Sequence, residues 1–310
     1  MSASTSTSTT PNPSTSTSTS TSTSTRDTPA PRDIPRPGAV RLTTAAITTL
    51  VARDLLRFVR QPSRIVGALS QPLLLWLVIG SGYGGTMRSA GEAGYLGYFF
   101  PGVVAMVVLF TAIFSTMSVI EDRHAGFLQA VLVAPAPRLA LVLGKTLGGT
   151  LIALFQGGLF LLLSPWAGFP LGNVHWPAAL ATLALLSLGL TALGFALAWA
   201  IDSTQGYHAV MSVLLMPLWI VSGARFPAAK GGGWLATVMT WNPVAYGVAG
   251  LRRALAGGAL APGLGVPGAT AARELIVCAG FAIGCIALAA LASSAPSRRG
   301  RPARTRGAKP

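Results

Sequence analysis

The sequence predicts an all-α integral membrane protein that forms a bundle of six transmembrane helices. An amphipathic interfacial helix precedes the first span, and an amphipathic cytoplasmic helix connects the second span to the third. Of the 310 residues, 51% are hydrophobic and 10% are charged, whereas soluble domains carry about 25% charged residues. The mean hydropathy is +0.59. The apolar residues gather in stretches of about 20, the length of a helix that crosses a bilayer.

Composition divides the chain into three regions. Residues 1–40 are rich in Ser, Thr and Pro, and a segment with so few apolar side chains cannot offset the entropy of ordering, so we expect a disordered cytoplasmic tail. Residues 41–292 contain every long apolar stretch and form the predicted membrane domain. Residues 293–310 are a basic tail, which we also expect in the cytoplasm.

Ahead of the first span, apolar residues recur at helical spacing, as Ile47, Leu50, Val51, Leu55, Phe58 and Val59 show. Four arginines form a basic stripe on the same segment: Arg53, Arg57, Arg60 and Arg64. This pattern predicts a helix that lies flat on the membrane, with its arginines against anionic lipid headgroups. An N-terminal extension of the first span, kinked at Pro62, stays open as an alternative.

Six stretches are long and apolar enough to span a bilayer. They run approximately over residues 65–82, 98–120, 139–163, 177–201, 208–224 and 274–292.

The distribution of basic residues predicts the orientation, because positively charged loops are retained in the cytoplasm. With both termini in the cytoplasm, only six of the 23 Lys and Arg residues lie outside: Arg88, Arg225, Lys230, Arg252, Arg253 and Arg273. The net charge of +15 therefore follows membrane topology. No basic face with interleaved aromatic residues exists outside the tails, so nucleic acid is not an expected partner.

The connection between the second and third spans, residues 121–138, begins with charged residues and is apolar in its middle. Glu121 and Asp122 suit the positive end of a helix dipole, and Pro135 ends the predicted helix. A cytoplasmic helix with one apolar face is typical of helices that dock in a groove of another protein. A surface helix that rests on the membrane or on its own bundle is the alternative.

At these residues the sequence resembles the permease subunits of type-2 ATP-binding-cassette (ABC) transporters, especially the branch of daunorubicin and other antibiotic exporters. The resemblance runs from about Arg41 to Ala292. The residues that carry it between the second and third spans are Glu121, Asp122, Arg123, Gly126, Phe127, Leu128, Ala134, Pro135, Arg138, Gly144 and Lys145. Before the last span they are Ser222, Gly223, Phe226, Pro227, Trp241, Asn242, Pro243, Ala245, Tyr246 and Arg252.

The resemblance implies that residues 121–138 contain the coupling helix, which docks on a separate ATPase subunit, and that a second permease subunit, expected to be an identical copy, completes the pathway. It assigns ATPase coupling to Glu121, Asp122, Arg123, Gly126, Phe127, Leu128 and Leu132. It also implies short external helices that form an outer gate, here Trp241, Asn242, Pro243 and Tyr246. That this outer segment merely caps the bundle is an equally open interpretation.

No nucleotide, metal or other cofactor is expected on this chain. Gly144, Lys145 and Thr146 look like the end of a phosphate-binding loop, but position 139 is Leu139 where such a loop needs glycine. We expect Lys145 to extend its ammonium to the membrane interface. Two amides within the spans, Gln71 and Gln156, are candidates for a translocation path, although amides also serve as contacts between helices.

These features predict a non-enzymatic permease subunit in the cell membrane, in contact with its lipids, that exports a hydrophobic or amphipathic small molecule such as an antibiotic. A lipid or polysaccharide exporter is the nearest alternative. A secondary transporter or a membrane-embedded lipid-modifying enzyme is less expected, because no carboxylate stands at mid-span and no acids or histidines cluster.

Overall fold

The computed structural model describes residues 39–82, 94–126, 137–226, 232–258, 260 and 264–294. These described residues belong to one compact unit. Over the described residues the secondary structure is helical, without strands. Six of these helices are long and apolar enough to cross a membrane: Ile65–Gly82, Gly94–His124, Arg138–Leu161, Trp176–Ala200, Thr204–Ala224 and Ala271–Ser294. The six predicted spans are therefore confirmed, with ends that differ by a few residues.

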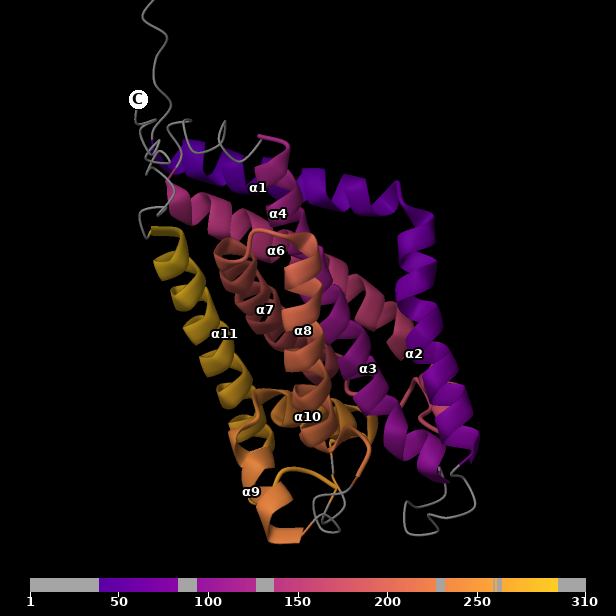
Figure 1. Cartoon of the computed structure of the whole chain (residues 1–310). Coiled ribbons are helices and arrows are strands. Elements are labelled where there is room, and N and C mark those ends of the chain that lie inside the picture. The colour runs from indigo at the N-terminus through magenta and orange to yellow at the C-terminus, as the bar shows by residue number, and fades with distance from the viewer. Residues whose placement is uncertain are drawn as a thin grey trace, which may run out of the picture. The chain divides into compact units, whose positions relative to one another are not determined.

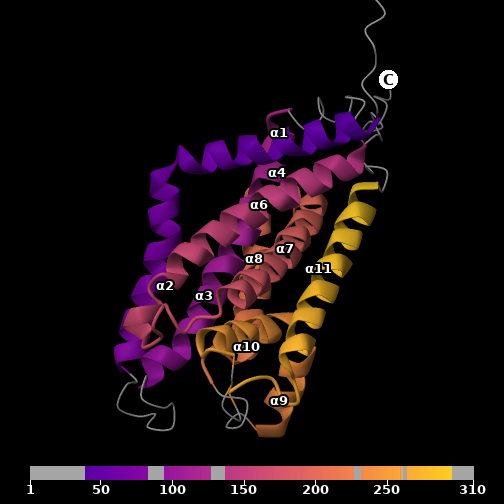
Figure 2. The same ribbon diagram turned by 180° about the vertical axis from the view of Figure 1, so that it is seen from behind.

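The helix ahead of the first span is separate from it. Two residues separate the end of helix α1 (Ala39–Val59) from Pro62, which occupies the first position of α2 (Pro62–Gly82). Proline suits the first helical turn because its missing N–H has no partner there in any case. Figures 1 and 2 show α1 lying across one end of the bundle and turning sharply into α2. The interpretation of α1 as a mere extension of the first span is wrong.

The second span consists of two helices, α3 (Gly94–Ser115) and α4 (Met117–His124), which meet at Thr116. The Thr116 hydroxyl lies 2.7 Å from the hydroxyl of Tyr207 on α8 (Thr204–Trp219). Tyr207 is buried and also donates to the carbonyl of Ile113, at 3.1 Å. The junction is therefore held against α8 by hydrogen bonds that satisfy the polar groups inside the bundle.

Helix α7 (Trp176–Ala200) is the centre of the bundle and packs against α3, α6 (Arg138–Leu161), α10 (Pro243–Leu255) and α11 (Ala271–Ser294). Its closest neighbour is α11, because Gly189 leaves room for it: a Cβ at that position would stand 2.5 Å from the ring of Phe281. Small residues at helix contacts let backbones approach closely inside a membrane. The short 3₁₀ helix η2 (Ser164–Ala167) follows α6.

The end of the bundle opposite α1 is closed by two short helices, α9 (Gly232–Trp241) and α10, as Figure 1 shows. They follow a π-helical turn, η3 (Ile220–Ala224), that directly continues α8. Gly223 in this turn has φ +77, a left-handed conformation that side-chain-bearing residues adopt only at a cost. The prediction of short helices rather than another span in this region is confirmed.

Candidate functional site

A buried cluster of charged side chains joins α1, α4 and α6. The Lys145 ammonium lies 2.6 Å from Oδ2 of Asp122 and 3.1 Å from Oδ2 of Asp54, and it also donates to the Ser118 hydroxyl at 3.2 Å. Lys145 is 3% exposed and Asp122 2%. The expectation that Lys145 extends to the membrane interface is therefore wrong, because two carboxylates inside the bundle hold its ammonium.

The arginines of α1 face the same cluster. Arg53 donates to the Asp122 carboxylate, and Arg57 lies 3.7 Å from Asp122 and 3.8 Å from Glu121. Both arginines therefore face protein carboxylates, and that the arginine stripe of α1 also meets lipid headgroups stays a prediction. The apolar residues of α1 differ in burial, since Leu50 and Phe58 are buried, whereas Val59 is exposed. Helix α1 is thus bound to the bundle through charge as well as apolar contact.

Helix α1 can lie this close to α6 because of glycine. A Cβ at Gly144 would stand 2.9 Å from a methyl group of Leu50, and one at Gly148 would be 3.4 Å from the Cβ of Asp54. These two glycines form the face of α6 on which α1 rests. Lys145, next to Gly144 in the sequence, pairs with Asp54, so the same short stretch of α6 supplies both the contact surface and the cation.

The end of α4 is anchored to the C-terminal end of α7. Arg123 donates to the carbonyls of Ala198 and Trp199, at 3.2 and 3.0 Å, and forms an ion pair with Asp202 at 2.9 Å. A guanidinium at the carbonyl end of a helix is favourable because it faces the negative end of the dipole. Arg123 was predicted to couple to the ATPase, and its side chain is engaged within the chain.

The remaining residues predicted for ATPase coupling divide into two groups. Asp122 is buried in the charge cluster, whereas the Glu121 side chain is 49% exposed. Gly126 has φ +74 and nothing within 4 Å of its would-be Cβ, so backbone conformation rather than close packing within the chain requires glycine there. Phe127, Leu128 and Leu132 lie outside the described residues.

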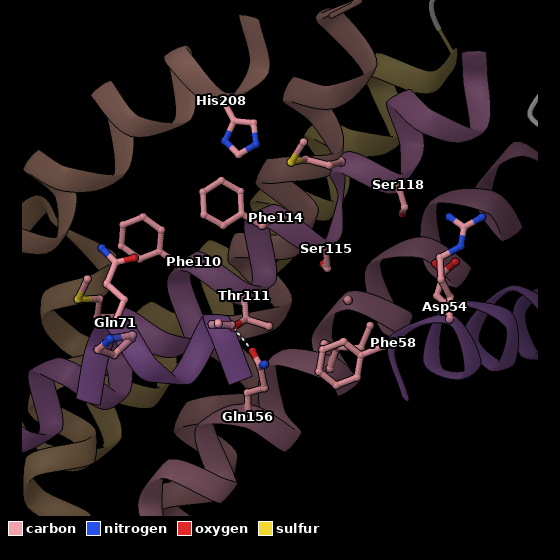
Figure 3. Close-up of a pocket in the computed structure, with 18 residues that line it drawn as sticks. Asp54, Phe58, Gln71, Phe110, Thr111, Phe114, Ser115, Ser118, Gln156 and His208 are labelled. Atoms are coloured by element: carbon pink, nitrogen blue, oxygen red, sulfur yellow. Dashed lines mark hydrogen bonds between the residues drawn. The ribbon is translucent and has the colours of Figure 1, made fainter. Parts of the chain in front are cut away.

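Next to the charge cluster lies a cavity of about 440 Å³, shown in Figure 3. It lies among helices α1, α2, α3, α4, α6 and α8, and its volume is within the range of pockets that take drug-sized molecules. Gln71 and Gln156, the two amides predicted for a translocation path, both line it. Asp54 and Ser118 belong to both the cavity wall and the charge cluster.

The residues predicted for an outer gate have clear structural roles. Asn242 caps α10: its Oδ1 accepts from the amide of Val244 at 2.9 Å, and its Nδ2 donates to the carbonyl of Leu218 at 2.7 Å. Pro243 occupies the first turn, where proline is favoured. Tyr246 is buried and donates to the carbonyl of Thr240, while Trp241 is 85% exposed.

Sequence reasoning missed the buried position of Arg252, which was counted as an outer charge and as one of the residues that carry the family resemblance. Its guanidinium lies 4.3 Å from the ring centroid of Tyr98 and donates to the carbonyls of Leu264 and Gly223. Burial lowers the pKa of Arg252 below the usual value for arginine. Its neighbour Arg253 instead pairs with Glu274, and that hydrogen bond raises the pKa of Arg253. The apolar residues around Arg252 in the sequence were the available signal.

The described residues contain no group of three or more His, Cys, Asp or Glu side chains placed to hold a metal ion.

Comparison with known proteins identifies the family. Residues 45–256 match the model of the family described as ABC-2 type transporter. A protein of Cyanophora paradoxa named as a transport permease, ycf38, is 27% identical over 211 residues, which cover 66% of this chain and 71% of that one. The daunorubicin resistance ABC transporter permease protein DrrB1 of Streptomyces coeruleorubidus is 22% identical over 224 residues, 72% of this chain and 78% of that one.

A protein of Escherichia coli (strain K12) named as a multidrug ABC transporter permease, YbhR, is 24% identical over 157 residues, 49% of this chain and 42% of that one. The family match covers more than half of the chain and includes five of its six candidate spans together with the charge cluster and the cavity. The chain therefore belongs to the ABC-2 type transporter family and is a multi-pass membrane permease subunit of an ABC transporter.

Proposed function

We propose that this permease exports a hydrophobic or amphipathic small molecule across the cell membrane, driven by ATP hydrolysis on a separate ATPase subunit. The observation that carries this proposal is the cavity beside the charge cluster. Its wall is mostly apolar, as the site of such a compound should be, and it includes aromatic rings from α1 and α3. Two of the three relatives described above are named for drug resistance or multidrug transport.

The contact with the ATPase is assigned to the segment that begins at Glu121. Glu121 is half exposed at the end of α4, and the glycine conformation at position 126 turns the chain out of that helix. The apolar residues that follow, Phe127 and Leu128, supply the face that would enter a groove on the partner. This arrangement requires α4 and both termini to be cytoplasmic, as the distribution of basic residues predicts.

Coupling between the ATPase and the cavity would pass through the charge cluster. Asp122 is next to Glu121 in α4, and Lys145 links Asp122 to Asp54, which lines the cavity. A displacement of α4 would therefore change the position of Asp54. We further propose that two copies of the chain pair in the membrane, as the resemblance to exporter permeases implies.

The test begins with affinity purification of the full chain from native membranes. An ATPase of the ABC class should copurify, and the two together in liposomes should move a hydrophobic dye when ATP is supplied. Dye movement driven by a proton gradient without ATP would contradict the proposal and favour a secondary transporter. Movement of lipid or polysaccharide, but of no small hydrophobic compound, would replace the proposed substrate class.

A further inference from the structure

The cavity wall beside the charge cluster is mainly apolar and aromatic. Phe110 and Phe114 of α3 stand on the side of α8, and Phe58 of α1 lies on the opposite side, as Figure 3 shows. The imidazole of His208 packs on the ring of Phe114, with 5.0 Å between ring centroids. An occupant of this space would therefore bury a largely apolar or aromatic body.

The charged groups at the cavity are compensated inside the chain. Asp54 and Arg57 line the wall, and each is within 4 Å of an opposite charge: Asp54 of Lys145, and Arg57 of Asp122 and Glu121. With Arg53, the cluster contains three carboxylates and three cations. On the cavity wall, the charges of Asp54 and Arg57 therefore cancel.

Two buried donors on residues of the cavity wall have no hydrogen-bond partner: Nη1 of Arg57, whose charge is compensated by the carboxylates of Asp122 and Glu121 within 4 Å, and the uncharged Nε2 of Gln156. The Oε1 atom of Gln156 accepts from the hydroxyl of Thr111, but its buried Nε2 atom has no hydrogen-bond partner. A buried donor without an acceptor costs free energy, and such groups in native proteins usually have a functional or structural cause. Figure 3 shows this amide on the cavity wall, pointing toward Thr111. An acceptor on an occupant would satisfy it.

We propose that the cavity binds an uncharged amphipathic compound, whose apolar body packs on Phe110 and Phe114 and whose carbonyl, ether or hydroxyl oxygen accepts a hydrogen bond from Nε2 of Gln156. Gln156 has no exposed surface, so the amide turns toward the cavity when the compound binds. An ion is disfavoured, because it would lose its hydration and find no uncompensated opposite charge. The proposal rests on the proposed function in taking this cavity as the transport site.

The experiment measures dye binding to the full chain in nanodiscs of phosphatidylcholine, with no ATPase present. Nile red is uncharged and carries a ring carbonyl, whereas rhodamine 6G is a larger aromatic dye with a delocalised positive charge. Nile red should bind at least tenfold more tightly than rhodamine 6G, after the signal of empty nanodiscs is subtracted. Gln156→Met, which replaces the amide with an apolar chain of similar length, should weaken Nile red binding about tenfold. Gln205→Met is the matched control, because Gln205 is exposed on α8 and does not line the cavity.

A second readout needs no variant. The carbonyl stretching frequency of Nile red bound to the wild-type chain should be lower than that of Nile red in lipid, because its oxygen accepts a hydrogen bond. Equal or tighter binding of rhodamine 6G would overturn the proposal, as would an unshifted carbonyl or unchanged binding to a folded Gln156→Met. Native mass spectrometry that finds a phospholipid which Nile red cannot displace would overturn it too. Because no ATP is used, failed transport with intact binding would contradict only the proposed function.

Discussion

Lys145 and Asp54 are 91 residues apart in the sequence, yet the ammonium of one lies 3.1 Å from the carboxylate of the other inside the bundle. The contact joins a helix that crosses the end of the bundle to one that spans the membrane. Asp122 shares the same ammonium from a third helix. A single cation thus fixes the positions of α1, α4 and α6 relative to one another.

Removing this cation should destabilise the protein strongly. In Lys145→Met, two buried carboxylates lose their shared partner, and breaking a buried ion pair from one side costs about 3–5 kcal/mol. We expect a clear fall in the thermal unfolding temperature of the detergent-purified chain. Arg60→Met, at an exposed arginine of the same region, should leave that temperature unchanged. The double variant Lys145→Met with Asp54→Leu should recover part of the loss, and no recovery would contradict the assigned pairing.

Docking on the ATPase should depend on Phe127. Phe127→Asp places a charge in the apolar face predicted to enter the partner's groove, and we expect it to abolish transport while the chain remains folded in the membrane. The measurement is copurification of the ATPase, together with ATP-driven dye movement. Leu171→Asp introduces the same carboxylate at an exposed residue between the third and fourth spans, and it should preserve both copurification and dye movement. Full transport by Phe127→Asp would remove the docking assignment.

The buried guanidinium of Arg252 should not be replaceable by an ammonium. In Arg252→Lys, the fixed fork that reaches Tyr98, Gly223 and Leu264 is lost, and each buried carbonyl left without a donor costs about 1–3 kcal/mol. We expect a lower thermal unfolding temperature and easier proteolysis of the 232–258 segment. Arg253→Lys retains a charge beside Glu274 and should have a much smaller effect. Equal effects of the two variants would contradict the role given to Arg252.

Two substitutions of Asn242 should separate its two hydrogen bonds. Asn242→Ala removes the cap of α10, a loss of about 1 kcal/mol, and also the bond to the Leu218 carbonyl. Asn242→Asp keeps the acceptor for Val244 but has no donor for Leu218. The thermal unfolding temperature of the wild type should therefore be higher than those of Asn242→Asp and Asn242→Ala. Trp241→Ala should unfold near the wild-type temperature because Trp241 is 85% exposed. A destabilised Trp241→Ala would indicate a contact beyond those described.

The sequence predicted the membrane architecture well, because apolar length alone sets the number of spans. Its apolar periodicity also predicted α1 as a helix separate from the first span. The sequence did not predict the ion pairs of that region. The partners of Lys145 lie on α1 and α4, far from it in the sequence, so the Lys145 ammonium was expected at the membrane interface. The family resemblance assigned Asp122 to a partner protein, and nothing in the sequence indicated its contact with Lys145. Gln71 and Gln156 were each singled out as polar groups within spans, but only the fold brings both to one cavity.

The π-helical turn Ile220–Ala224 makes the register of the chain ahead of α9 and α10 sensitive to a single residue. A π-turn accommodates one more residue than an α-turn, so every position after it is rotated by about 100° from where an unbroken helix would carry it. Deleting one residue here would rewind α8 into regular geometry and carry the Gly223 carbonyl away from the Tyr98 hydroxyl that now donates to it at 2.8 Å. Insertions and deletions in this stretch should therefore be far more harmful than substitutions, and related permeases should conserve its length more strictly than its composition.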